Sequence, residues 1–198
     1  MDIFYHGTYR LFDRFSLNHL GEGEGKSKFG HGIYITSNYT TAALYAVKAG
    51  KVNGVDSFYV YTVEVPDMTD SNNVFSCKPV TKEVIERIEK ALGQHIPEEA
   101  KNAGKLFRKY IGNLITNQIG TITQMISKAD AVAESAVSKF FRDNGIIYLV
   151  WPQSQAKPNG DTNRAVLDDK CIKILKIEQV QINSKNKLIE SSQIDIKL

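Results

Sequence analysis

Strand-like segments near both ends of the chain enclose a long central block with helical periodicity, and this order limits the fold more than any other feature. Residues 57–66 alternate and are rich in aromatic and β-branched side chains, as in a half-buried strand. Residues 172–182 are also strand-like. Between them, Val84, Ile88 and Leu92 keep the spacing of one helix face. The order predicts an α+β domain in which strands and helices are segregated along the chain.

Start and stop signals set the expected elements. Ser37 or Asn38 can cap a helix that Gly50 ends, and Thr81 can cap another that ends at Gly93. The sequence predicts helices over residues 40–48, 82–92, 97–111 and 122–142. It predicts strands over residues 3–5, 32–36, 57–66, 146–151, 165–167 and 172–182.

The length of 198 residues fits one domain, which we place at residues 1–183, followed by a loosely ordered polar C-terminal tail at 184–198. No segment approaches the roughly 18 apolar residues of a membrane span. No basic stretch followed by an apolar run opens the chain, so we expect a cytoplasmic protein with no membrane partner, and export without a classical signal stays open. Cys77 and Cys171 lack partner spacing, which favours a reducing compartment and no metal.

The formal net charge of +3 permits contact with nucleic acid without requiring it. Lys105, Arg108 and Lys109 form the densest basic cluster. Such a cluster is usually the solvated face of a helix, and the alternative is a contact with nucleic acid.

Several common catalytic motifs do not occur in the sequence. It contains no phosphate-binding loop that ends in Lys-Ser/Thr, no histidine pair at metal spacing and no nucleophile elbow. Gly21, Gly23 and Gly25 alternate with glutamates, but they do not connect a strand to a helix as a dinucleotide fingerprint does. Residues 21–25 therefore form either a flexible loop or one that covers a ligand.

The remaining chemical signal lies in the first 46 residues. His6 ends an apolar strand and precedes Gly7, where a backbone can approach a ligand closely. Tyr34 lies in a strand and Tyr45 on the next helix, so their rings can flank a flat group. The alternative is that His6, Tyr34 and Tyr45 are simply core residues of a structural or interaction protein.

These residues and their neighbours carry a family resemblance. Tyr5-His6-Gly7-Thr8, then Gly32-Ile33-Tyr34-Ile35-Thr36, then Ala42-Ala43-Leu44-Tyr45 resembles the diphtheria-toxin and poly-ADP-ribose-polymerase branch of the ADP-ribosyltransferases. That branch carries a His-Tyr-Glu triad. The wider stretch over residues 12–45 is more similar still to the small ADP-ribosyltransferase domains of phage polyvalent proteins. The resemblance implies a split antiparallel β-sheet core with flanking helices and a helical insertion in the middle.

The resemblance also implies roles. His6 would bind a ribose hydroxyl of NAD, the backbone of Gly7 the nicotinamide amide, and Tyr34 and Tyr45 the nicotinamide ring. Thr8 and the loop that contains Gly23 would lie near the ribose or phosphates.

The third triad position departs from the family pattern, because Asn163 stands where the polymerase branch has its Glu. An amide can bind a ribose hydroxyl but cannot offset the positive charge of an oxocarbenium ion. Three readings stay open: slow transfer of one ADP-ribose, a base supplied by the acceptor or by a nearby acid such as Asp161, or NAD binding without turnover.

We therefore expect a mono-ADP-ribosyltransferase that uses NAD as co-substrate, with a protein or nucleic-acid acceptor. The resemblance suggests a toxin or phage-conflict factor, restrained by a possible antitoxin. NAD glycohydrolase and a silent NAD- or ADP-ribose-binding module are the alternatives. Trp151 either contributes to the acceptor face or closes the core.

Overall fold

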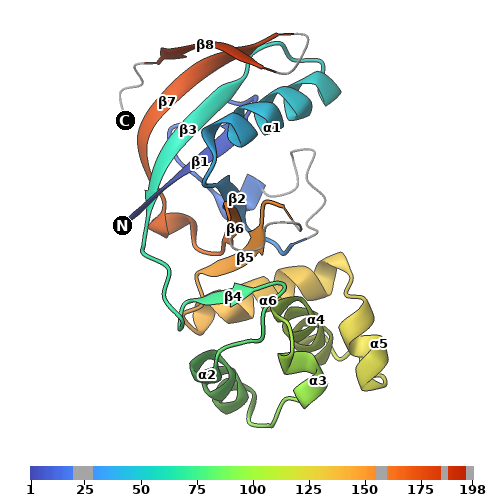
Figure 1. Cartoon of the computed structure of the whole chain (residues 1–198). Helices are drawn as coiled ribbons and strands as arrows, with labels where there is room; N and C mark the ends of the chain where they lie inside the picture. Colours follow the sequence, from blue (N-terminus) through green and yellow to red (C-terminus); the bar gives the residue numbers. More distant parts are fainter. Residues whose placement is uncertain (20–28, 155–159, 184–186, 195–198) are drawn as a thin grey trace.

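An eight-stranded sheet with the order β4-β5-β6-β2-β1-β3-β7-β8 forms the centre of the molecule (Figure 1). The computed structural model describes residues 1–19, 29–154, 160–183 and 187–194. The pairings are antiparallel except that of β4 with β5, which is parallel. The expected α+β class is confirmed. The strands are β1 (Asp2–Thr8), β2 (Ile33–Thr36), β3 (Tyr59–Val65), β4 (Asn73–Phe75), β5 (Tyr148–Pro152), β6 (Thr162–Val166), β7 (Lys173–Ile182) and β8 (Leu188–Gln193).

The sheet is split between β1 and β2. Their pairing is confined to Tyr5 opposite Thr36, whereas β1 pairs along its whole length with β3. One half is therefore β4-β5-β6-β2 and the other is β1-β3-β7-β8. Where paired strands diverge, backbone groups lose their ladder partners and become available to side chains.

Helix α1 (Tyr39–Val52) follows β2 and packs against the β1 half (Figure 1). Asn38 caps it, since its side chain accepts a hydrogen bond from the Thr41 amide at 2.9 Å. The buried Ala42, Ala43 and Ala46 form its inner face. Gly50 does not end this helix, as the sequence predicted; it is buried within the last turn, where a Cβ would lie 2.4 Å from the Phe58 ring.

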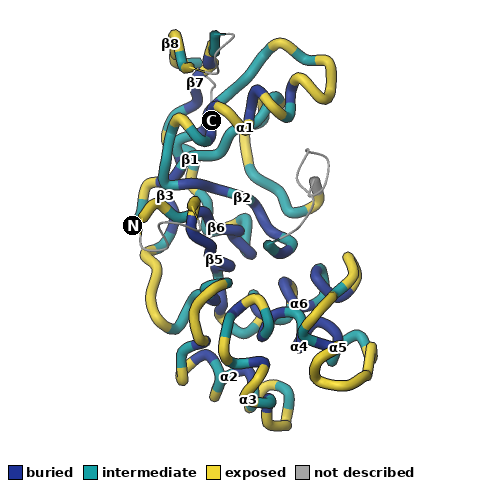
Figure 2. Tube along the Cα trace, turned by 45° about the vertical axis from the view of Figure 1, so that its right-hand side comes forward, coloured by how far each residue is buried: buried dark blue, intermediate teal, exposed yellow. Residues whose placement is uncertain are grey.

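A helical block follows β4 and packs at the other end of the molecule, against the β5 half (Figures 1 and 2). It comprises α2 (Lys82–Leu92), α3 (Glu98–Lys101), α4 (Gly104–Ile115), α5 (Ile122–Ser127) and α6 (Ala131–Asp143). The helices expected over residues 97–111 and 122–142 are wrong in extent, because each of these regions forms two helices. The second of these is interrupted before Asp130, whose side chain accepts from the Ala133 amide at 2.8 Å and so starts a new helix.

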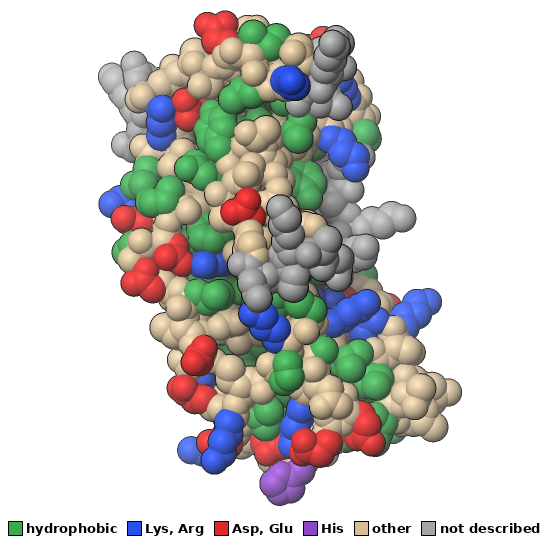
Figure 3. Space-filling view, viewed as in Figure 1, with side chains coloured by type: hydrophobic (Ala, Val, Ile, Leu, Met, Phe, Trp, Pro, Cys, Tyr) green, Lys and Arg blue, Asp and Glu red, His purple; other side chains and the backbone are tan. Residues whose placement is uncertain are grey.

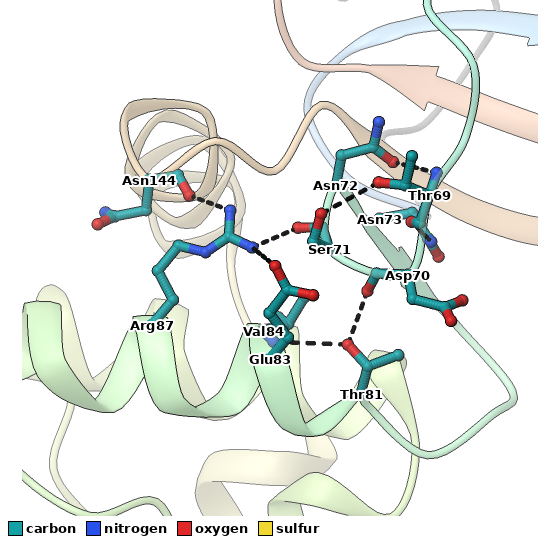
Figure 4. A network of polar contacts seen from close by, with 10 residues as sticks. All are labelled: Thr69, Asp70, Ser71, Asn72, Asn73, Thr81, Glu83, Val84, Arg87 and Asn144. Carbon is teal, nitrogen blue, oxygen red and sulfur yellow. Dashed lines mark hydrogen bonds and ion pairs between the residues drawn. The ribbon is translucent and has the colours of Figure 1, made fainter.

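Strand β4 was not predicted, because three residues give too short a pattern. It leads into the helical block, and a polar network anchors the junction (Figure 4). Arg87 donates from Nη2 to the Ser71 carbonyl at 2.7 Å and from Nη1 to the Asn144 carbonyl at 3.0 Å. The Thr81 hydroxyl, at the start of α2, donates to the Asp70 carbonyl at 2.7 Å. The loop before β4, α2 and the end of α6 are thereby tied together.

The C-terminal segment contributes more structure than expected. We predicted a loosely ordered tail from residue 184, but β8 pairs with β7 from Leu188 to Gln193. The polar, exposed sequence of β8 lacks the apolar alternation that predicts a strand, because this edge strand buries little apolar surface.

Candidate functional site

His6 and Tyr34 meet across the split in the sheet. The Nδ1 atom of His6, on β1, lies 2.7 Å from the backbone carbonyl oxygen of Tyr34, on β2. A carbonyl oxygen only accepts, so Nδ1 carries the proton of a neutral ring and Nε2 is left as an acceptor. Among the described residues, none hydrogen-bonds Nε2. The His6 side chain thus links β1 to β2 where the backbone hydrogen bonds between these strands have ended.

Aromatic rings enclose the imidazole of His6. Its ring lies 5.1 Å from that of Phe15 and 6.3 Å from those of Phe12 and Tyr61, measured between centroids. Burial lowers the pKa of His6, and the hydrogen bond to Tyr34 opposes this only in part. The ring is therefore neutral at pH 7, a state in which Nε2 can accept from a hydroxyl.

Gly7 is fixed by packing. A Cβ at this position would lie 1.7 Å from the Ala42 carbonyl oxygen and 3.0 Å from the Ala46 amide nitrogen. The absence of a side chain lets α1 lie directly on β1. Tyr45 stands three residues beyond Ala42, on the neighbouring helix surface, with 55% of its area exposed. The side chain of Tyr45 is thus within one helical turn of the Gly7 contact.

Tyr34 organises the chain that precedes its strand. Its hydroxyl donates to the Gly30 carbonyl at 2.9 Å and accepts from the Phe29 amide at 3.2 Å. Its ring meets that of Trp151 edge-on at 5.0 Å, and Phe29 stacks on Trp151 at 4.4 Å. Burial raises the pKa of the Tyr34 hydroxyl, so it stays protonated. Trp151 is 8% exposed and closes the core here, the more conservative of its two predicted roles.

The ring of Tyr34 and the ring of His6 lie on opposite faces of the sheet. Side chains alternate along strands, and the pairing of Tyr5 with Thr36 places Tyr34 on the α1 face and His6 on the other. The packing agrees, since Tyr34 contacts Trp151 while His6 contacts Phe15. The two residues are joined through the Tyr34 backbone and not through their side chains.

Three cross-strand rows lie on the Tyr34 face of β5, β6 and β2. The first row is Leu149, Ala165 and Tyr34, and the second is Trp151, Asn163 and Thr36. The third row is Gln153, Asp161 and Asn38. The backbone amide of Gln153 donates to the Asp161 carbonyl at 2.8 Å, and the side-chain amide of Asn38 donates to the Asp161 carboxylate at 3.5 Å. The rows pass from apolar and buried to polar and exposed.

Asn163 lies in the second row, between the apolar first row and the polar third row, and is 5% exposed. Its buried Oδ1 atom has no hydrogen-bond partner among the described residues. A buried polar atom without a partner costs about 1–3 kcal/mol, so Oδ1 is an acceptor on this face that an added donor would satisfy. The pairing of Asn163 with Thr36 places it diagonally next to Tyr34.

Asp161 lies at the exposed rim of the same face. Its carboxylate accepts from the Ser37 hydroxyl at 3.3 Å and from the Asn38 side chain at 3.5 Å. The sequence pointed to Asp161 but not to Ser37 and Gln153 as its neighbours. The only signal for them was strand register, which a single sequence does not display.

Three further expectations concern the surroundings. Thr8 accepts from the Arg10 amide at 3.1 Å and closes the turn after β1. Gly23 lies outside the described residues. In the described part of the chain, no group of three or more His, Cys, Asp or Glu side chains is placed to hold a metal ion.

The basic cluster is largely engaged within the fold. Arg108 is 2% exposed and forms an ion pair with Glu134, from Nε to Oε2 at 2.8 Å. Lys109 donates to the Ser127 carbonyl. Burial raises the pKa of Glu134, and Arg108 opposes that rise. Acidic and basic side chains are interspersed over the face seen in Figure 3.

No protein-family model, curated protein or solved structure matches this chain. Across the described ranges, no helix has the length and apolar character needed to cross a membrane.

Proposed function

We propose that this protein transfers a single ADP-ribose from NAD to a macromolecular acceptor and releases nicotinamide. The observation that carries the proposal is the unpartnered, buried amide oxygen of Asn163 beside Tyr34. A ribose hydroxyl is a donor that would satisfy this atom. The sequence resemblance of residues 5–8, 32–36 and 42–45 to ADP-ribosyltransferases supports the same ligand.

The proposed chemistry takes place on the Asn163 face of the sheet. The resemblance assigns His6 to a ribose hydroxyl, but its ring lies on the sheet face opposite Asn163, so the proposed ribose contact rests on Asn163. Tyr34, on the Asn163 face, and Tyr45 would flank the nicotinamide. The bond between ribose C1′ and the nicotinamide nitrogen breaks with its electron pair on nicotinamide, which leaves a cationic ribose carbon. Asn163 holds the ribose but offers no negative charge. The lack of one such group costs on the order of 3 kcal/mol, or about a hundredfold in rate, which favours slow, single transfer.

A silent NAD-binding module is the second candidate, and the neutral side chain of Asn163 favours it. An NAD glycohydrolase, in which water replaces the acceptor, uses the same site.

One experiment separates these functions. Purified protein is incubated with adenine-labelled NAD and a cell lysate, and both free nicotinamide and label in precipitated macromolecules are measured. Transfer predicts both products in equal amounts. Nicotinamide without incorporation indicates hydrolysis, and intact NAD with measurable binding indicates the silent module. Asn163→Glu, which restores a carboxylate, should raise the release of nicotinamide if the transferase or hydrolase account is right.

A further inference from the structure

The rim row of Gln153, Asp161 and Asn38 lies where an acceptor would approach a ribose held by Asn163. Asp161 is two residues from Asn163 on the same strand face, and both are paired with the β2 segment that leads into α1. The row is exposed at Gln153 and Asp161, whereas Asn163 and Thr36 beneath it are buried. A group reaching Asn163 from solvent on this side therefore passes Asp161.

From this placement we infer that the acceptor is a protein side chain with an O–H or N–H nucleophile, and that Asp161 receives its proton. This inference rests on the proposed function. The acceptor's lone pair forms the bond to C1′ as nicotinamide leaves, and the acceptor's proton passes to the Asp161 carboxylate and then to water. The overall change is NAD and acceptor to ADP-ribosyl acceptor, nicotinamide and one proton.

The charges of the site favour a protein over a nucleic acid. The nine positions of the three rows contain one carboxylate, on Asp161, and no lysine or arginine. A nucleic acid is held mainly by cations against its phosphates, and a carboxylate at the entrance repels them. The densest basic cluster in the sequence contributes little, because Arg108 is buried against Glu134 and Lys109 is bonded to Ser127, which leaves Lys105 as its exposed member.

Asp161 is held in a defined position. The Ser37 hydroxyl and the Asn38 amide both donate to its carboxylate, and the Ser37 hydroxyl also accepts from the Thr162 amide at 3.2 Å. Gln153, beside it, donates to the Thr41 hydroxyl at 2.5 Å. These contacts orient the carboxylate while leaving it exposed, as a group that meets an incoming side chain must be.

The test uses the full chain, labelled NAD and a cell lysate, with the labelled product divided between protease and nuclease. The inference predicts that protease frees the label and nuclease does not. In Asp161→Asn, the rate of label incorporation should fall at least about tenfold, since a positioned base contributes about a hundredfold or more. Asp161→Glu should recover part of this loss. Asp56→Asn, an exposed aspartate in the loop before β3, is the matched control and should leave this rate unchanged.

The outcomes are distinguishable. Release of label by nuclease alone overturns the inference but leaves the proposed function standing. An unchanged rate of label incorporation in Asp161→Asn, with thermal unfolding like that of Asp56→Asn, overturns the role of Asp161. If the wild-type protein releases no nicotinamide, the proposed function itself fails, and this inference fails with it.

Discussion

The His6 imidazole and the Tyr34 backbone are joined by one hydrogen bond, 2.7 Å from Nδ1 to the carbonyl oxygen, where the two strands separate. This bond fixes the ring's tautomer as well as its position. Nδ1 has a structural partner, and the ring lies among Phe12, Phe15 and Tyr61 on the sheet face opposite Asn163.

Amide substitutions at His6 test the link to Tyr34. Asn places its amide near the position of Nδ1, and Gln near that of Nε2. We expect His6→Asn to keep the link to Tyr34, most of the stability and most of the nicotinamide release. His6→Gln should be less stable and less active than His6→Asn, because the Tyr34 backbone loses its partner. Thermal unfolding and a chromatographic nicotinamide assay check both, and the reverse order in either measurement would contradict the assignment of the nitrogens.

The buried His6 also predicts how stability changes with pH. Its pKa in the folded protein is lower than the ordinary value of 6.5, so the unfolded chain binds more protons as pH falls. The free energy of unfolding should therefore decrease as pH drops below about 6.5. Denaturant titrations between pH 7.5 and 5.5 should show a smaller decrease in His6→Asn. Part of the slope will persist, since burial also lowers the pKa of His31. Equal slopes in the two proteins would argue against the effect of His6.

Asn163→Leu should make the protein more stable and less active. The substitution removes a buried polar atom that lacks a partner among the described residues and replaces it with apolar volume. We expect a gain of about 1 kcal/mol in the free energy of unfolding, together with a fall in nicotinamide release. Chemical denaturation and the nicotinamide assay measure the two effects. A marked loss of stability would instead indicate that the Asn163 amide is satisfied within the fold.

The ion pair between Arg108 and Glu134 should behave as a buried pair. Glu134→Gln leaves the Arg108 charge without its carboxylate, and we expect it to cost about 3–5 kcal/mol. The double substitution Arg108→Met with Glu134→Leu removes both charges and should cost much less. Denaturant unfolding of the wild type, Glu134→Gln and the double variant measures these costs. If the stability of Glu134→Gln is close to that of the wild type, water reaches the ion pair.

Gly7→Ala should destabilise the fold by displacing α1, because the new Cβ would overlap the Ala42 carbonyl. Such overpacking costs about 1–3 kcal/mol. Gly120→Ala is a suitable comparison, since its Cβ would meet only the flexible Gln124 side chain. Thermal unfolding should show the larger shift for Gly7→Ala, and equal shifts would mean that α1 adjusts freely.

The sequence predicted the elements with strong local signals and missed those set by contacts between distant segments. Helix α1 and strand β3 were predicted because a cap at Asn38 and an alternating pattern at residues 57–66 are local features. Strand β4 pairs with β5, and strand β8 pairs with β7. A local sequence pattern does not predict such pairings. Gly50 looked like a helix end because glycine commonly plays that part, but here its role is contact with Phe58.

The same distinction holds for the candidate site. His6, Tyr34 and Asn163 were singled out by sequence, and the structure brings them to neighbouring strands. The separation of the His6 and Tyr34 rings by the sheet was not foreseen, because it depends on the register of Tyr5 with Thr36. Nor did the sequence reveal that Asn163 is buried with an unpartnered oxygen, which depends on every neighbour of its side chain.

The most direct test is a calorimetric titration of NAD into the wild-type protein and into Asn163→Leu. If Asn163 holds the ribose, one NAD binds per chain and the Kd is at least about tenfold weaker in Asn163→Leu, since a buried hydrogen bond contributes about 1.5 kcal/mol. The variant should also remain folded. No binding to the wild type, or equal affinity in the two proteins, would contradict the claim that Asn163 and its neighbours hold NAD.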